Sequence, residues 1–261
     1  MNRIAALLLA CVSLATAESN LGAPVVGMAR DSQDRLRALY GVAGSFVLRE
    51  PIADKVLDWA FDGKDGLVKT DSELLALDAS GKVIGRRAAR GDAVISAGAA
   101  FFPATGELWL IGAHPDRKIS IERNALGGDV VALGIPDTQS APLAVCRANR
   151  VWLVTVDVAS GAVTRETLAP GAIGDQACAG ALVWLEGNFL MATARGLIMQ
   201  SPGSEVHKLP IAGGDHSTKR DIHRAGERWV QVESTGASPV LVLVTIDGGK
   251  VYRLPAMGAR P

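Results

Sequence analysis

Aspartates recur along this chain at intervals of about 40 residues. Each one ends a short phrase of small or apolar residues, and the five are Asp54, Asp92, Asp137, Asp175 and Asp215. Carboxylate oxygens are preferred ligands of hard cations such as Ca²⁺, and they also attract basic ligands. Carboxylates that converge without a partner repel one another. A ring of these side chains would therefore imply a bound ligand.

A second interpretation of the same aspartates is local. An aspartate side chain readily accepts hydrogen bonds from backbone amides two or three residues further along, which stabilises a turn. A repeated fold reuses a repeated turn, so even spacing alone does not require a ligand. Both interpretations remain open from the sequence.

The segment GGDHSTKRDIHRAG concentrates ionisable side chains, among them His216, Asp221 and His223. Histidine can ligate metals or exchange protons near neutral pH. The spacing matches no zinc motif, and a third ligand would have to come from another part of the chain. The alternative is a solvated polar loop.

Two common chemistries lack their sequence motifs. The chain contains no G-x-S-x-G phrase, which marks the nucleophile turn of many serine hydrolases. The glycine pairs in LGGD and GGDHST lack the preceding strand, the spacing and the following helix of a phosphate-binding loop. Neither a serine hydrolase nor a nucleotide enzyme is indicated.

The elements that must position these residues come from one repeated unit, an apolar strand, a polar turn and a second apolar strand. Its six copies are VVGMARDSQDRLRALYGV, VLDWAFDGKDGLVKT, AGAAFFPATGELWLIGA, LAVCRANRVWLVTVD, GALVWLEGNFLMAT and DIHRAGERWVQVES. A second hairpin with a glycine-bearing turn follows most copies. Two hairpins in each repeat predict an all-β, six-bladed β-propeller with four-stranded antiparallel blades, of which the first could be shorter. A pair of β-sandwiches is the alternative.

In this propeller the five aspartates fall in the connections from the last strand of one blade to the first strand of the next. The two cysteines beyond the N-terminus, Cys146 and Cys178, fall in innermost strands of neighbouring blades. Their positions relative to the turns differ, which offsets them by about 20 Å along the channel, beyond the reach of a disulfide. We therefore predict two separate buried thiols.

The N-terminus predicts export. Residues 1–17, MNRIAALLLACVSLATA, place Arg3 before an apolar run and end in the small-x-small phrase Ala15-Thr16-Ala17, as a cleaved signal peptide does. A lipoprotein with Cys11 as the modified residue is the alternative. No later apolar run is long enough for a membrane helix. We expect one propeller domain over residues 18–261, located in the periplasm or outside the cell.

The chain resembles secreted bacterial β-propeller proteins of unassigned function, of the type found in Acidobacteria. The resemblance is carried by the phrase GMARDSQDRLRALYGVAGSFVLRE and by the repeat that follows it over most of the chain. It implies a secreted propeller. It implies no site residues.

These observations lead to two functional hypotheses. Lys and Arg together number 27, as do Asp and Glu, so no charge excess favours nucleic acid. The first hypothesis is a monomeric, non-catalytic module that binds a protein, peptide or glycan and requires no cofactor. The second is a propeller enzyme, a lactonase-like hydrolase or a lyase, with Ca²⁺ or another divalent cation at the channel mouth. Whether the protein is an enzyme stays open, and the motifs favour the first hypothesis.

Overall fold

The computed structural model describes residues 25–42, 45–112, 116–169, 182–185, 188–193, 196–200, 206–209, 220–234, 240–245 and 250–254. The predicted signal peptide lies outside these ranges. No helix among the described residues is long and apolar enough to cross a membrane.

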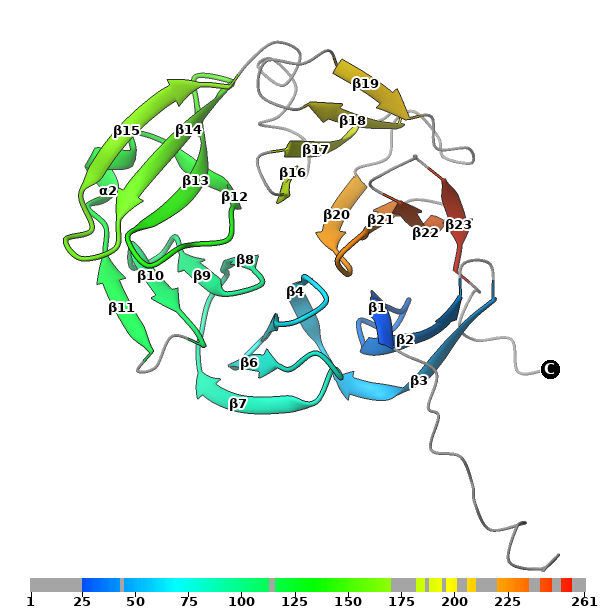
Figure 1. Cartoon of the computed structure of the whole chain (residues 1–261). Coiled ribbons are helices and arrows are strands. Elements are labelled where there is room, and N and C mark those ends of the chain that lie inside the picture. Colours follow the sequence, from blue (N-terminus) through cyan, green and yellow to red (C-terminus); the bar gives the residue numbers. More distant parts are fainter. Residues whose placement is uncertain are drawn as a thin grey trace, which may run out of the picture.

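The strands form six antiparallel sheets arranged as blades around a ring (Figure 1). Blade 1 contains β1 (Val25–Arg30), β2 (Leu36–Val42) and β3 (Ser45–Ala53), and blade 2 contains β4 (Val56–Phe61), β5 (Gly66–Thr70), β6 (Glu73–Leu77) and β7 (Val83–Ala88). Blade 3 contains β8 (Val94–Ser96), β9 (Ala99–Phe102), β10 (Glu107–Leu110) and β11 (Arg117–Ser120). Blade 4 contains β12 (Asp129–Leu133), β13 (Ser140–Arg147), β14 (Arg150–Asp157) and β15 (Val163–Leu168), after the short helix α2 (Arg123–Leu126). Blade 5 contains β16 (Leu182–Leu185), β17 (Asn188–Thr193), β18 (Gly196–Gln200) and β19 (Val206–Leu209), and blade 6 contains β20 (Arg220–Arg224), β21 (Trp229–Ser234), β22 (Val240–Thr245) and β23 (Val251–Arg253). The predicted six-bladed propeller is confirmed.

The hairpin β13–β14 shows how local sequence forms a blade. Both strands are rich in β-branched and apolar residues, which suit a sheet covered on both faces. Ala148 and Asn149 have φ angles of 46° and 61°, as the two central residues of a tight hairpin turn require. Because this turn fixes the register, Val145 lies opposite Trp152 and Leu143 opposite Val154. Leu143 and Val154 are fully buried against the neighbouring blade 3.

Two of the predicted hairpins occupy a different place in their blades from the one expected. The segment AGAAFFPATGELWLIGA forms β9–β10 and LAVCRANRVWLVTVD forms β13–β14, which are the second and third strands outward from the channel. The innermost strands are β8 and β12, and β8 has only three residues. Placing an innermost strand in each of these two segments was therefore wrong, because innermost strands of three and five residues leave little periodic signal.

The cysteine prediction is also wrong. Cys146 lies near the end of β13, the second strand of blade 4, and not in an innermost strand. Cys146 is disulfide-bonded. The chain's other two cysteines, Cys11 and Cys178, lie outside the described residues.

Blade 1 is the shorter blade, and among the described residues it lacks an innermost strand. Strand β1 lies further from the channel than its neighbours β4 and β20, which contact each other directly (Figure 1). Phe61 at the end of β4 and Ala225 just after β20 form an isolated parallel bridge. The innermost strands around the channel are therefore β4, β8, β12, β16 and β20.

The first and last blades meet at a polar seam. The backbone of Arg30 in β1 forms two hydrogen bonds with the side chain of Gln231 in β21. The Arg30 amide donates to Oε1 of Gln231 at 2.9 Å, and Nε2 of Gln231 donates to the Arg30 carbonyl at 2.9 Å. The Arg30 guanidinium contacts Glu233 through Nη2 at 2.6 Å and through Nε at 3.1 Å, and Nη1 donates to the carbonyl of Val56 in blade 2 at 3.2 Å. Arg30 therefore joins blades 1, 6 and 2.

The backbones approach closely at this seam. The amide of Met28 donates to the carbonyl of Ala225 at 2.7 Å. A Cβ atom at Gly27 would lie 2.2 Å from the same carbonyl oxygen. Only glycine allows β1 to lie this near to β20.

The outermost strand of every blade carries an exposed basic side chain. These residues are Arg49, Arg86, Arg117, Lys118, Arg165, Lys208 and Arg253. A charged side chain on a strand edge disfavours pairing with another chain.

Candidate functional site

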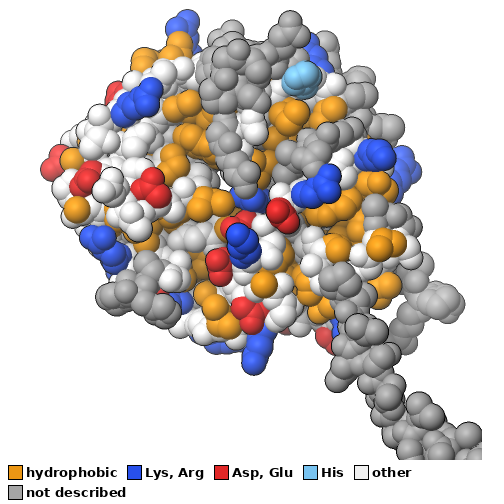
Figure 2. All heavy atoms as spheres, in the orientation of Figure 1, with side chains coloured by type: hydrophobic (Ala, Val, Ile, Leu, Met, Phe, Trp, Pro, Cys, Tyr) orange, Lys and Arg blue, Asp and Glu red, His pale blue; other side chains and the backbone are white. Residues whose placement is uncertain are grey.

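A cavity of about 380 Å³ lies in the channel. It is lined by residues of the five innermost strands and their flanking residues, and by Arg30 of β1. Figure 2 shows acidic and basic side chains gathered near the middle of one face of the ring. Apolar side chains and a small number of ionisable groups make up the wall. This composition is typical of ligand pockets.

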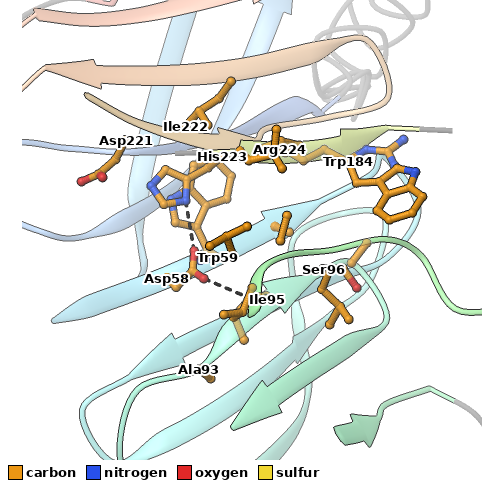
Figure 3. Close-up of a pocket in the computed structure, with 18 of the residues that line it drawn as sticks. Asp58, Trp59, Ala93, Ile95, Ser96, Trp184, Asp221, Ile222, His223 and Arg224 are labelled. Atoms are coloured by element: carbon orange, nitrogen blue, oxygen red, sulfur yellow. Dashed lines mark hydrogen bonds and ion pairs between the residues drawn. The ribbon is translucent and has the colours of Figure 1, made fainter. Parts of the chain in front are cut away.

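Asp58 joins three innermost strands at the cavity wall. It lies in β4, and its Oδ1 accepts hydrogen bonds from the amide of Trp59 at 2.7 Å and from Nδ1 of His223 in β20 at 3.1 Å. Its Oδ2 accepts from the amide of Ile95 in β8 at 3.2 Å (Figure 3). Asp58 thus helps to close the ring where blade 1 has no innermost strand.

His223 lies between this carboxylate and an indole. Its ring stacks on Trp59 with 5.3 Å between the centroids and 18° between the planes, and its side chain is 8% exposed. Nε2 of His223 is buried without a hydrogen-bond partner among the described residues. In the neutral ring Nδ1 carries the proton that it donates to Asp58, which leaves a lone pair on Nε2.

Apolar and aromatic side chains form part of the cavity wall. Trp184 in β16 is half-buried and packs on Phe189, with 4.6 Å between the ring centroids. In Figure 3 its ring lies across the cavity from Asp58 and His223. Leu57 and Ile135, which also line the cavity, are 48% and 40% exposed. A ligand in the cavity would cover these apolar surfaces.

Two acidic side chains of the cavity wall make no ion pair among the described residues. Asp92 is exposed and Asp221 half-buried, and neither makes a side-chain hydrogen bond or ion pair within the described part of the chain. Burial lowers the pKa of Arg30, but the hydrogen bond and charge of Glu233, with smaller effects of Asp34 and Asp221, outweigh burial and raise it. The positive charge of Arg30 is thus paired with the carboxylate of Glu233. Arg224 also lines the cavity.

The structure separates the predicted aspartates. Asp54 is exposed between β3 and β4 and does not line the cavity, whereas Asp92, between β7 and β8, does. Asp137 lies between β12 and β13, within blade 4, so its assignment to a blade-to-blade connection was wrong. Because strands alternate in direction, this turn lies at the opposite end of the blade from the connection that enters it. Asp175, Asp215 and His216 lie outside the described residues.

Asp137 instead stabilises its own turn. Its Oδ1 accepts from the amides of Gln139 at 2.7 Å and Ser140 at 2.6 Å, and its Oδ2 accepts from the Ser140 hydroxyl at 2.9 Å. The two amide hydrogen bonds, followed by the hydroxyl, lower the pKa of Asp137. Asp62, Asp78 and Asp157 accept backbone amides of their own turns in the same way. The local interpretation therefore holds for Asp137.

Of the histidine-rich segment, Asp221 and His223 reach the cavity. They belong to strand β20 and not to a loop. The sequence pointed to His223 but not to its partner Asp58, which is 165 residues away. Nothing in the sequence around Asp58 signals this contact, because it depends on β20 lying beside β4. Within the described ranges, no group of three or more His, Cys, Asp and Glu residues could hold a metal ion. The Ca²⁺ site remains a prediction.

No model of a protein family matches the chain, and no curated protein matches it. Solved structures do match. PorZ, described as a surface component of the type-IX secretion system of Porphyromonas gingivalis, shares 11% identity at a TM-score of 0.48 over 90% of this chain and 33% of its own. AztD from Citrobacter koseri shares 13% at 0.41 over 90% and 72%, and Hsv2 from Kluyveromyces lactis shares 9% at 0.39 over 83% and 77%. These likenesses carry no argument about the function of this chain.

Proposed function

We propose that the protein is an exported, non-catalytic binding module that holds its ligand in the channel cavity. The ligand is a small molecule, or a projecting group of a protein, peptide or glycan. The observation that carries the proposal is the cavity itself. Its volume of about 380 Å³ lies within the range of small-molecule sites, and its wall combines apolar surface with a few polar groups.

The arrangement around His223 supports binding over covalent catalysis. An activated nucleophile lies within hydrogen-bond reach of its base. Ser96 has the single hydroxyl side chain among the described residues of the cavity wall, and its Oγ lies 3.5 Å from the carbonyl of Ala99. Within the described part of the chain, Nε2 of His223 has no hydroxyl or thiol as a hydrogen-bond partner.

Export rests on residues 1–17. The experiment is expression with the native N-terminus in a Gram-negative host, followed by intact mass measurement of the periplasmic protein. A chain that begins at Glu18 is the expected product. Retention of residues 1–17 on cytoplasmic protein would contradict export.

Binding is tested by a small-molecule screen that follows the melting temperature. Compounds that bind the cavity are expected to raise Tm of the wild-type protein but not of Ala93→Phe, which narrows the cavity. The control is Asp129→Asn, an exposed position that is not among the residues lining the cavity. Bound compounds are expected to be recovered unchanged. If no compound distinguishes wild type from Ala93→Phe, the channel is not the binding site.

A lyase-like enzyme is the second candidate, and the Asp58–His223 pair is the observation that favours it. A carboxylate that orients an imidazole is an arrangement used in general base catalysis. Conversion of a bound compound by the wild type, together with its loss in His223→Gln, would establish this candidate in place of the first. A divalent cation is no longer required in this version of the hypothesis.

A further inference from the structure

We infer that the channel cavity selects a ligand with a cationic nitrogen attached to an apolar group. This inference rests on the proposed binding function and names its ligand class. Three features of the wall support it: carboxylates that make no ion pair among the described residues, aromatic and aliphatic surface in the same wall, and a buried polar side chain with an unmet hydrogen bond.

The carboxylates are the first feature. Asp92 and Asp221 line the cavity and make no ion pair within the described residues. The negative charge of Asp58 is met by two backbone amides and one imidazole nitrogen. Arg30 offsets only part of the charge of Asp221, because Glu233 binds its guanidinium at 2.6 Å. A cation that enters the cavity would meet acceptors that already lack a partner.

The apolar surface is the second feature. Seven large hydrophobic side chains are exposed among the described residues, and two of them, Leu57 and Ile135, lie at this one cavity. Trp184 adds the edge and face of an indole. A cation beside an indole is attracted by its π-electrons, and an apolar substituent on the nitrogen would cover Leu57 and Ile135. A small hydrated inorganic cation would use neither surface.

His223 is the third feature. Its ring is more than nine-tenths buried in the wall, and Nε2 has no hydrogen-bond partner among the described residues. In the tautomer whose Nδ1 proton is donated to Asp58, Nε2 is an acceptor. An N–H donor is the partner that this tautomer lacks. The three features therefore favour an organic ammonium group.

The test compares three probes of one size: benzylamine, benzyl alcohol and benzoate. Binding is measured by calorimetry and by tryptophan fluorescence. We expect benzylamine to bind with Kd on the order of 1 mM, and the alcohol and the carboxylate to bind about tenfold or more weakly. Asp221→Asn and Asp92→Asn should each weaken benzylamine about tenfold, as loss of a charge-assisted hydrogen bond does. Asp129→Asn should leave its affinity unchanged.

The outcomes separate this inference from the proposed function. Stronger binding of benzoate than of benzylamine, or equal binding of all three probes, would overturn the cationic class while leaving the channel as a binding site. Loss of affinity in Asp129→Asn equal to that in Asp221→Asn would show a long-range charge effect and also overturn the inference. Melting curves of each variant without probe exclude a folding defect as the cause.

Discussion

The seam between blades 1 and 6 makes a quantitative prediction. Arg30 and Glu233 have side chains that are 12% and 15% exposed, so removal of either one leaves a charge that solvent reaches poorly. Breaking a buried, hydrogen-bonded ion pair in this way costs about 3–5 kcal/mol, and the residual exposure reduces this to about 2–4 kcal/mol. We expect this loss for Arg30→Met and for Glu233→Leu.

The double variant Arg30→Met/Glu233→Leu leaves neither charge unpaired. Its destabilisation should be smaller than the sum of the two single losses by at least about 1.5 kcal/mol. The measurement is urea unfolding followed by tryptophan fluorescence, since Trp229 lies in the same strand as Glu233. For a chain of this length each kcal/mol corresponds to about 2–4 °C in Tm.

A matched pair on the surface provides the control. Arg86 and Glu73 also form an ion pair, at 3.0 Å, but their side chains are 59% and 40% exposed. The same cycle there should give a coupling energy of about 0–0.5 kcal/mol. A coupling energy at Arg30–Glu233 no larger than at Arg86–Glu73 would refute the conclusion that this contact closes the ring.

Three further predictions concern buried groups. Burial raises the pKa of Asp31, but Arg37, the amides of Gln33 and Arg35 and the Arg35 side chain lower it below 3.8. The stabilisation that ionised Asp31 gives the folded state is present above the unfolded pKa and is lost as the pH falls through the folded pKa. In urea unfolding, Asp31→Asn should therefore weaken the loss of stability in acid and cost about 2–4 kcal/mol at pH 7. Burial lowers the pKa of Lys69, and Asp71 and Asp92 partly oppose this effect. Between the folded pKa and 10.5 the unfolded chain therefore binds more protons than the folded chain, so stability rises with pH in that window. Lys69→Met should remove this rise and stabilise the protein by about 1–3 kcal/mol at pH 7. If Cys178 is the partner of Cys146, peptide mapping without reductant should recover the two together, and Cys146→Ser should cost about 3–4 kcal/mol.

The fold could be predicted because its signals are local and repeated. Glycine-bearing turns and apolar strand pairs, such as β13–β14, recur often enough to indicate six blades. The strand order within a blade was harder to predict. The strand β8 has three residues, Val94–Ser96, too few to leave a periodic pattern in the sequence. A prominent second hairpin was therefore taken for the first in blades 3 and 4.

The site could be predicted only in part, because its geometry depends on an unusual contact. His223 was identified from the local concentration of ionisable residues. Asp58 was not, since an aspartate two residues into a strand carries no signal of its own. The pair forms because blade 1 has no innermost strand among the described residues, which brings β20 beside β4. Asp137 was expected in a ring of carboxylates but stabilises its own turn within blade 4.

The exposed basic side chains on the outer strands bear on how molecules meet one another. Among the described strands, the outermost strand of each blade has one edge without a strand partner, so one molecule offers several edges around its circumference. Matching edges on several sides would let molecules link into a network in place of simple pairs. Like charges on the edges, from Arg49 in blade 1 to Arg253 in blade 6, oppose each such contact over about a Debye length. The colloidal stability of this nearly neutral protein thus depends on where its charges lie, and added salt should weaken that protection.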